Sequence, residues 1–234
     1  GGALVVGCLL LWRGPTNLEE DRASVQRELL AATNSRDSAR AVALKERLGS
    51  LMERHPADYY FPLAGAYTAR QLGESPIVWV QRALERGPTV GRTHLLLAEY
   101  LLVRGLSNQG LMEVRLALEY EPTLASAAAP LVVRYASTPE AVFAAVPLGE
   151  QGGFALEVFS ISFGTAAKLE VRQALDREAL VRDPDLLSPR RRLAEDLLLA
   201  LESKKAHCAV ERSDCLSKLE SDAQVIATKY PNHT

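Results

Sequence analysis

The chain has 234 residues, enough for one extended domain or two small ones. Hydrophobic residues make up 47% and charged residues 24%, a composition that indicates a folded chain and excludes a disordered one. The formal net charge is −2, so the chain has no excess of Lys and Arg for phosphates, and we expect no nucleic-acid partner. Leu and Ala are abundant and β-branched residues form no alternating runs, which predicts an all-α fold.

The first twelve residues, GGALVVGCLLLW, carry no charge. A membrane-spanning helix needs about 20 apolar residues, so this segment is too short to cross by itself. Trp12 and Arg13 are typical of the membrane interface, and Gly14-Pro15 then ends the segment. We interpret residues 1–14 as the end of a truncated transmembrane or signal-anchor helix that attaches the chain to a membrane. A buried terminal helix and a signal-peptide remnant are the alternatives.

Prolines recur behind the long helical stretches, at Pro56, Pro88 and Pro122, with spacings of 32 and 34 residues. A fixed period of this size indicates stacked helical hairpins. Two antiparallel helices approach closely where a small side chain faces a large one. We therefore expect a close crossing at the small residues of each hairpin, with Ala64 facing the region of Ala83 and Ala98 facing that of Ala117.

The predicted helices follow the chain in pairs. Ser75-Pro76 is expected to start one helix, and Gly105 to end another. Pro130 is expected to break the helix of residues 123–135, and residues 147–153 are expected to form a Gly-rich loop. The predicted helices are 20–34, 36–55, 57–73, 76–87, 92–104, 109–120, 123–135, 140–146, 153–163, 165–182, 189–206 and 213–229.

The segments LAGAYTARQLG, WVQRALERGP and LLLAEYLLVRGLSNQGLMEVRLALEYEP resemble tetratricopeptide (TPR) repeats. The resemblance covers residues 57–122 well and the rest loosely. It implies a right-handed α-solenoid of antiparallel hairpins, with TPR-like repeats over 15–136 and degenerate repeats over 137–234. In such repeats the first helix of each hairpin lines a concave groove that binds an extended peptide or protein partner. The groove positions implied here are Asp58, Phe61, Arg92, Leu95, Glu99, Leu102 and Arg134; ordinary helix-surface roles for these residues are the alternative.

The order of an apolar segment, Trp-Arg, a helical stretch, RHPADYYFPL and repeats is also similar to the C-terminal tail of bacterial O-antigen ligase and polymerase-like membrane proteins. That resemblance implies an inner-membrane protein of the cell envelope whose soluble part lies in the periplasm. Its glycan chemistry would belong to the multi-spanning part, which is not in this sequence. The present region would then be a non-catalytic scaffold. A stand-alone adaptor or co-chaperone that binds extended peptides is the alternative.

Motifs for chemistry are scarce. The sequence has no HExxH, GxSxG or CxxC motif and no Gly-rich phosphate loop, so we expect no catalytic residue, metal or cofactor. Cys208 and Cys215 flank a hairpin tip, where a disulfide and two free thiols are both compatible with the sequence. Asp183 and Asp185 are expected to form a turn rather than bind a metal. The basic run of residues 190–192 is interpreted as a solvated face, with contact to acidic lipid headgroups or to a phosphorylated glycan as the alternative.

Overall fold

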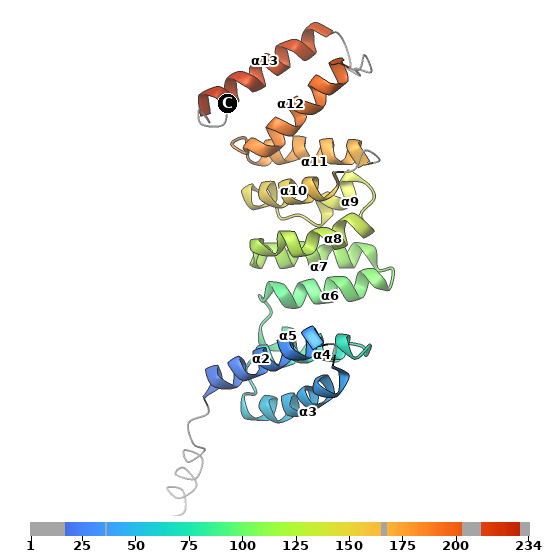
Figure 1. Ribbon diagram of the computed structural model, residues 1–234, viewed down its shortest axis with the longest axis vertical. Helices are drawn as coiled ribbons and strands as arrows, with labels where there is room; N and C mark the ends of the chain where they lie inside the picture. The colour runs from blue at the N-terminus through green and yellow to red at the C-terminus, as the bar shows by residue number, and fades with distance from the viewer. Residues whose placement is uncertain (1–16, 36, 165–167, 203–211, 230–234) are drawn as a thin grey trace, which may run out of the picture. The chain divides into compact units, whose positions relative to one another are not determined.

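The computed structural model describes residues 17–35, 37–164, 168–202 and 212–229. Over these residues it contains twelve α-helices, one 3-10 helix and no strand (Figure 1). The predicted all-α fold is confirmed. The chain forms two compact units, which divide between Tyr100 and Leu101 and are described separately below.

Unit 1 is built from two helical hairpins and the start of a third. Helix α2 packs against α3 and also against α4, the first helix of the next hairpin. Helix α4 in turn packs against both α3 and α5. The helices are α2 (Leu18–Ser35), α3 (Ser38–Arg54), α4 (Tyr60–Gln71), α5 (Ile77–Arg86) and α6 (Gly91–Val103), the last of which continues into unit 2.

The predicted repeat closures share one local structure. The residue before the proline is His55, Gly87 or Glu121. Its φ and ψ angles are −125° and 66° at His55, −147° and 77° at Gly87, and −142° and 82° at Glu121. Each of these residues donates its backbone N–H to the carbonyl four residues earlier, which ends the helix. Asp183, before Pro184, repeats this arrangement with angles of −139° and 94°. The recurrence confirms that the chain is repeat-like, in its C-terminal half as well.

Unit 1 has two apolar clusters that share one tryptophan. The first cluster joins α2, α3 and α4, and the second joins α4, α5 and α6. Ala64 belongs to the first cluster, whereas Ala66 and Ala83 belong to the second, so the cluster that contains Ala83 includes Ala66 rather than Ala64. Trp79 contacts both clusters.

Gly65 explains how Trp79 fits between the two clusters. A Cβ atom at Gly65 would lie 2.1 Å from Cε3 of the Trp79 indole, far inside van der Waals contact. The missing side chain therefore makes room for the indole ring against the backbone of α4.

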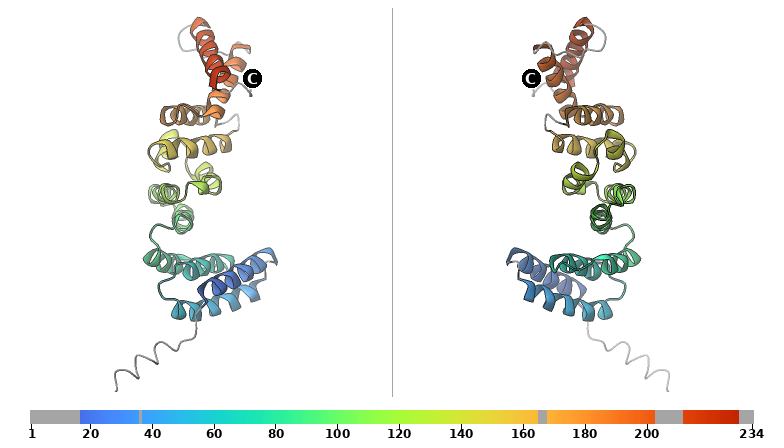
Figure 2. Two further views of the ribbon diagram at one scale, coloured as in Figure 1. Left: turned by 90° about the vertical axis from the view of Figure 1, so that its left-hand side faces the viewer. Right: turned by 90° about the vertical axis from the view of Figure 1, so that its right-hand side faces the viewer.

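Unit 2 continues the pairwise packing of neighbouring helices. Helix α7 packs against η1, α8 and α9; α8 packs against α10, and the contacts then run from α10 to α11, α12 and α13 in turn. Figure 2 shows α10 and α11 lying side by side. These elements are α7 (Ser107–Tyr120), η1 (Pro122–Leu124), α8 (Ala125–Tyr135), α9 (Pro139–Ala144), α10 (Glu150–Ser162), α11 (Leu169–Arg182), α12 (Leu187–Glu202) and α13 (Arg212–Lys229).

Two local predictions in unit 2 are wrong. Helix α8 continues through Pro130, whose ring is exposed, rather than breaking there. Helix α10 begins at Glu150, so Gly152 and Gly153 are helical residues and not part of a loop. A Cβ atom on Gly152 would meet the carbonyl oxygen of Pro147 at 2.0 Å, so the glycine permits a close backbone approach. By contrast, Gly105 ends α6 as predicted, with φ of 78°.

Candidate partner-binding surface

Three of the predicted groove residues share one face of α6. Arg92, Leu95 and Glu99 are separated by three and four residues, the spacing that places side chains on the same side of a helix. Arg92 is exposed, while Leu95 and Glu99 are half-buried. Arg70 of α4 donates to Glu99 at 2.5 Å, so an ion pair connects this face to the neighbouring first helix.

Asp58 is already occupied by two partners within the protein. Its carboxylate accepts a hydrogen bond from the backbone N–H of Tyr60 at 2.8 Å, at the start of α4. It also forms an ion pair with the guanidinium of Arg22 on α2. The structure thus gives Asp58 a role in joining α2 to the first turn of α4; a role in binding a partner stays a prediction.

Phe61 and Leu102 are fully buried, and their assignment to a ligand-facing surface is corrected to the core. The ring of Phe61 stacks on His55, with 5.3 Å between ring centroids, and packs in the apolar cluster of α2, α3 and α4. Helix α2 contributes to the burial of Phe61, because its Val25 belongs to the same cluster. Arg134 is exposed on α8 in unit 2, and it is described only within that unit.

Arg22 contacts the rings of two tyrosines, and these contacts were not predicted. The guanidinium carbon of Arg22 is 5.8 Å from the ring centroid of Tyr59 and 6.0 Å from that of Tyr60, within the range of a cation–π contact. Burial raises the pKa of the Tyr60 hydroxyl, and the positive charges of Arg22 and Arg92 oppose that increase.

We call Arg22, Tyr59, Tyr60, Arg92, Leu95 and Glu99 the first-helix surface, because they lie on α2, on α6 and at the start of α4, with Tyr59 as its N-cap. It combines two cations, two amphipathic rings, one aliphatic side chain and one acid. Such a set suits contacts with both the backbone and the side chains of an extended peptide. The only sequence signal for the unpredicted part of this surface was the Tyr59-Tyr60 pair, which directly follows Asp58. Arg22 had no such signal, because α2 lies outside the segment that resembles TPR repeats well.

A second polar group holds α2 against the end of α3. Asp21 accepts from Nε2 of His55 at 2.9 Å and from Nη1 of Arg54 at 3.2 Å. The hydrogen bond from His55 holds the pKa of Asp21 below its ordinary value of 3.8, with the charge of Arg54 acting in the same direction. Two adjacent residues of α2 thus bind partners of opposite charge type: the acid Asp21 binds His55, and the base Arg22 binds Asp58.

Replacing Asp21 by asparagine is expected to lower the free energy of unfolding at pH 7 by about 1–3 kcal/mol, the scale of a charge-assisted hydrogen bond. Because the folded pKa lies below 3.8, the carboxylate stabilises the protein above that value and loses its effect as pH falls through the folded pKa. Urea unfolding from pH 2 to pH 7 measures the difference. Glu20→Gln, an exposed neighbour, is the control; an Asp21 effect that is constant with pH would contradict the account.

Two arginines of the basic run are used inside unit 2, so the interpretation of the run as a solvated face is wrong for them. Arg192 pairs with Asp176 of α11 at 2.6 Å, and Arg190 pairs with Asp222 of α13 at 3.0 Å. Only Arg191 projects outward, with a side chain that is 68% exposed. The predicted Asp turn is confirmed: the backbone N–H of Asp185 donates to Oδ1 of Asp183 at 3.0 Å.

Some predictions concern residues that the structure does not describe. The predicted membrane segment, residues 1–14, and Cys208 lie outside the described residues, and the side chain of Cys215 is likewise not described. Within the described ranges, no helix has the length and hydropathy needed to cross a bilayer. The same ranges contain no group of three or more His, Cys, Asp and Glu side chains placed to hold a metal ion.

Comparison with known proteins gives no family assignment: no protein-family model matches this sequence, and no curated protein matches it.

Proposed function

We propose that the chain is a non-catalytic, TPR-like interaction domain that binds an extended protein or peptide segment on its first-helix surface. The observation that carries the proposal is the shared position of α2, α4 and α6. Helix α2 contacts α4, and α4 is joined to α6 through Arg70 and Glu99. A right-handed TPR-like array needs its first helices to lie next to one another, because together they form one continuous binding face.

The chemistry of the first-helix surface supports a peptide rather than a small molecule. Its arginines and Glu99 offer charge contacts, while Tyr59, Tyr60 and Leu95 offer apolar area. Glu99 and Asp58 are both paired with arginines of the protein, so a partner has to accept a surface whose charges are already largely balanced. An extended segment of mixed composition meets this condition better than a strongly charged ligand does.

Selection of binding peptides from a random display library tests this proposal on the full chain. Reversal of charge at Arg92, as Arg92→Glu, is expected to weaken the selected peptides about tenfold or more in fluorescence anisotropy, since a lost charge contact at an interface costs about 1–3 kcal/mol.

Arg82→Glu is the matched control for this test, because Arg82 is an exposed arginine on α5, a second helix. It should leave the affinity within about twofold. Selected peptides that are weakened equally by the two reversals, or only by the change at Arg82, would refute the assignment to the first-helix surface.

We further propose that the domain belongs to a membrane-anchored envelope protein of a bacterium, with this part in the periplasm, as the tail of an O-antigen ligase-like glycan-assembly protein. The support is the sequence order of apolar segment, Trp12-Arg13 and helical repeats. The alternative is a stand-alone adaptor or co-chaperone. The sequence upstream of Gly1 separates them: about a dozen spans supports the ligase-like protein, and a single span or signal supports the adaptor.

A further inference from the structure

Among the side chains that the structure describes in the last hairpin of unit 2, none is a fully buried leucine, isoleucine, valine or aromatic residue. Of the side chains described in α12 and α13, Pro189 alone is buried, and the leucines of α12 are half-buried or exposed. In the described chain, the series of fully buried hydrophobic residues ends at Ala179 of α11. Burial of apolar area is the main favourable contribution to packing, so the hairpin gains less from it than the preceding helices do.

Arginine–aspartate pairs take the place of that core. Arg172 of α11 pairs with Asp196 of α12, Arg192 of α12 pairs with Asp176 of α11, and Arg190 of α12 pairs with Asp222 of α13. In all three pairs both side chains are at most 17% exposed. No other Arg or Lys ion pair given for the described residues has both partners this well buried.

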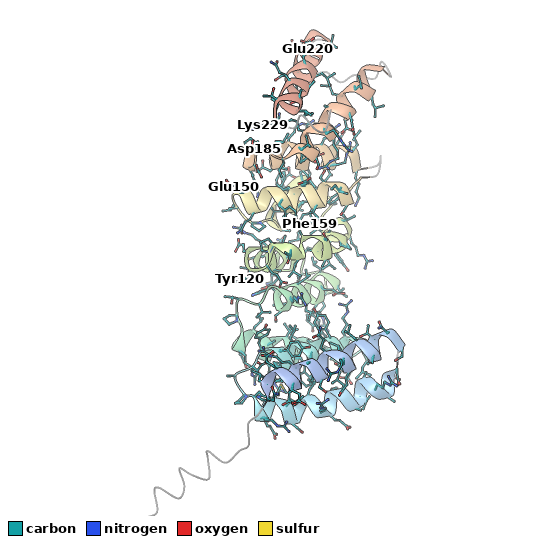
Figure 3. The ribbon with its side chains drawn as sticks, turned by 60° about the vertical axis from the view of Figure 1, so that its left-hand side comes forward. Tyr120, Glu150, Phe159, Asp185, Glu220 and Lys229 are labelled. Atoms are coloured by element: carbon teal, nitrogen blue, oxygen red, sulfur yellow. The ribbon has the colours of Figure 1, made fainter. Side chains whose placement is uncertain are left out.

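The innermost pair is the most completely bonded. Asp176 is fully buried; one carboxylate oxygen accepts from Ser160 of α10 at 2.6 Å and from Nη2 of Arg192 at 2.6 Å, and the other accepts from Nε of Arg192 at 3.2 Å. At the outer edge, Lys229 pairs with Asp185, and Figure 3 shows these two residues near each other at the end of α13. Ion pairs are therefore found both where α12 packs on α11 and at the end of α13.

Buried and partly buried ion pairs add little net stability to a fold. The cost of removing both charges from water offsets most of their attraction, whereas removal of one partner leaves the other charge buried and is strongly destabilising. A hairpin held in this way therefore has a small free energy of attachment. Segments with few buried apolar contacts are the ones that open locally under native conditions.

We propose that α12–α13 is an electrostatic latch: a hairpin that opens from α11 as one unit while α2–α11 stay folded. Opening separates the paired arginines and aspartates and uncovers the face of α11 that carries Asp176. The protein thereby has a conformational change built into its C-terminal end. This inference does not depend on the partner proposed above.

Hydrogen–deuterium exchange of the full chain, read by mass spectrometry, tests the latch. In the unaltered protein, amides of α12 and α13 are expected to exchange at least about tenfold faster than those of α4. Arg192→Gln should accelerate α12 and α13 by roughly 10- to 100-fold further and leave α4 unchanged. Arg191→Gln, which removes the same charge from an exposed position one residue away, should change exchange by less than about twofold.

A second variant keeps the test decisive if Arg192→Gln also loosens α10 and α11 around the buried Asp176. Arg190→Gln breaks the pair between α12 and α13, away from Asp176, and should accelerate α13 with α10 and α11 unaffected. Protection of α12 and α13 equal to that of α4 in the unaltered protein would overturn the latch. Equal effects of the changes at Arg190, Arg191 and Arg192 would overturn it as well.

Discussion

Phe61→Ala is expected to destabilise unit 1 by about 3–5 kcal/mol, the range for removing a fully buried aromatic ring. The ring contributes to the apolar cluster of α2, α3 and α4 and stacks on His55, so its loss leaves a cavity where three helices meet. Urea unfolding followed by Trp79 fluorescence measures the change, because Trp79 packs against this cluster. Trp12→Phe in all variants makes Trp79 the single tryptophan of the chain.

Phe154→Ala is the control for Phe61→Ala. Phe154 lies on α10 with 46% of its surface exposed, and its removal should cost less than about 1 kcal/mol. If Phe61→Ala were instead stable but lost peptide binding, Phe61 would face a ligand as the sequence alone predicted. Its placement in the core would then be wrong.

Gly65→Ala is expected to destabilise unit 1 by about 1–3 kcal/mol, although alanine favours a helix over glycine by about 1 kcal/mol. The new methyl group would stand 2.1 Å from the Trp79 ring, so the indole has to leave its position between the two apolar clusters. The same Trp79 fluorescence measurement reports both the lower stability and the moved ring, through a shift of its emission maximum.

Gly49→Ala separates this clash from helix propensity. Gly49 lies inside α3, and a Cβ atom there would meet nothing within 4 Å, so the change should be neutral or stabilising by up to about 1 kcal/mol. In a Trp79→Leu background, Gly65→Ala should lose most of its cost. A stabilising Gly65→Ala in the unaltered background would contradict the close contact of α4 with Trp79.

The ends of several helices were the part of the fold that the local sequence predicted well. Proline disfavours continuation of the preceding helix, and Pro56, Pro88 and Pro122 each follow a helix end, whereas α8 continues through Pro130. Gly105 marked another because its backbone adopts a positive φ. These signals act within a few residues of the chain, and a single sequence contains them in full.

The side-chain partners across helices were not predictable in the same way. The sequence placed Arg190 and Arg192 in one basic run, but only packing of α12 against α11 and α13 decides that they meet Asp176 and Asp222. Phe61 looked like a groove residue because nothing in its own repeat shows that α2 covers it. Gly152, in the same way, needed the nearby Pro147 carbonyl to explain a glycine inside a helix.

The most direct test of the account is a hydrogen-exchange footprint of a display-selected peptide on the full chain. If the first helices form the binding face, the bound peptide slows exchange in α2, α4 and α6 and leaves α3 and α5 unchanged. Protection confined to α3 and α5, or a footprint without this alternation, would contradict the account.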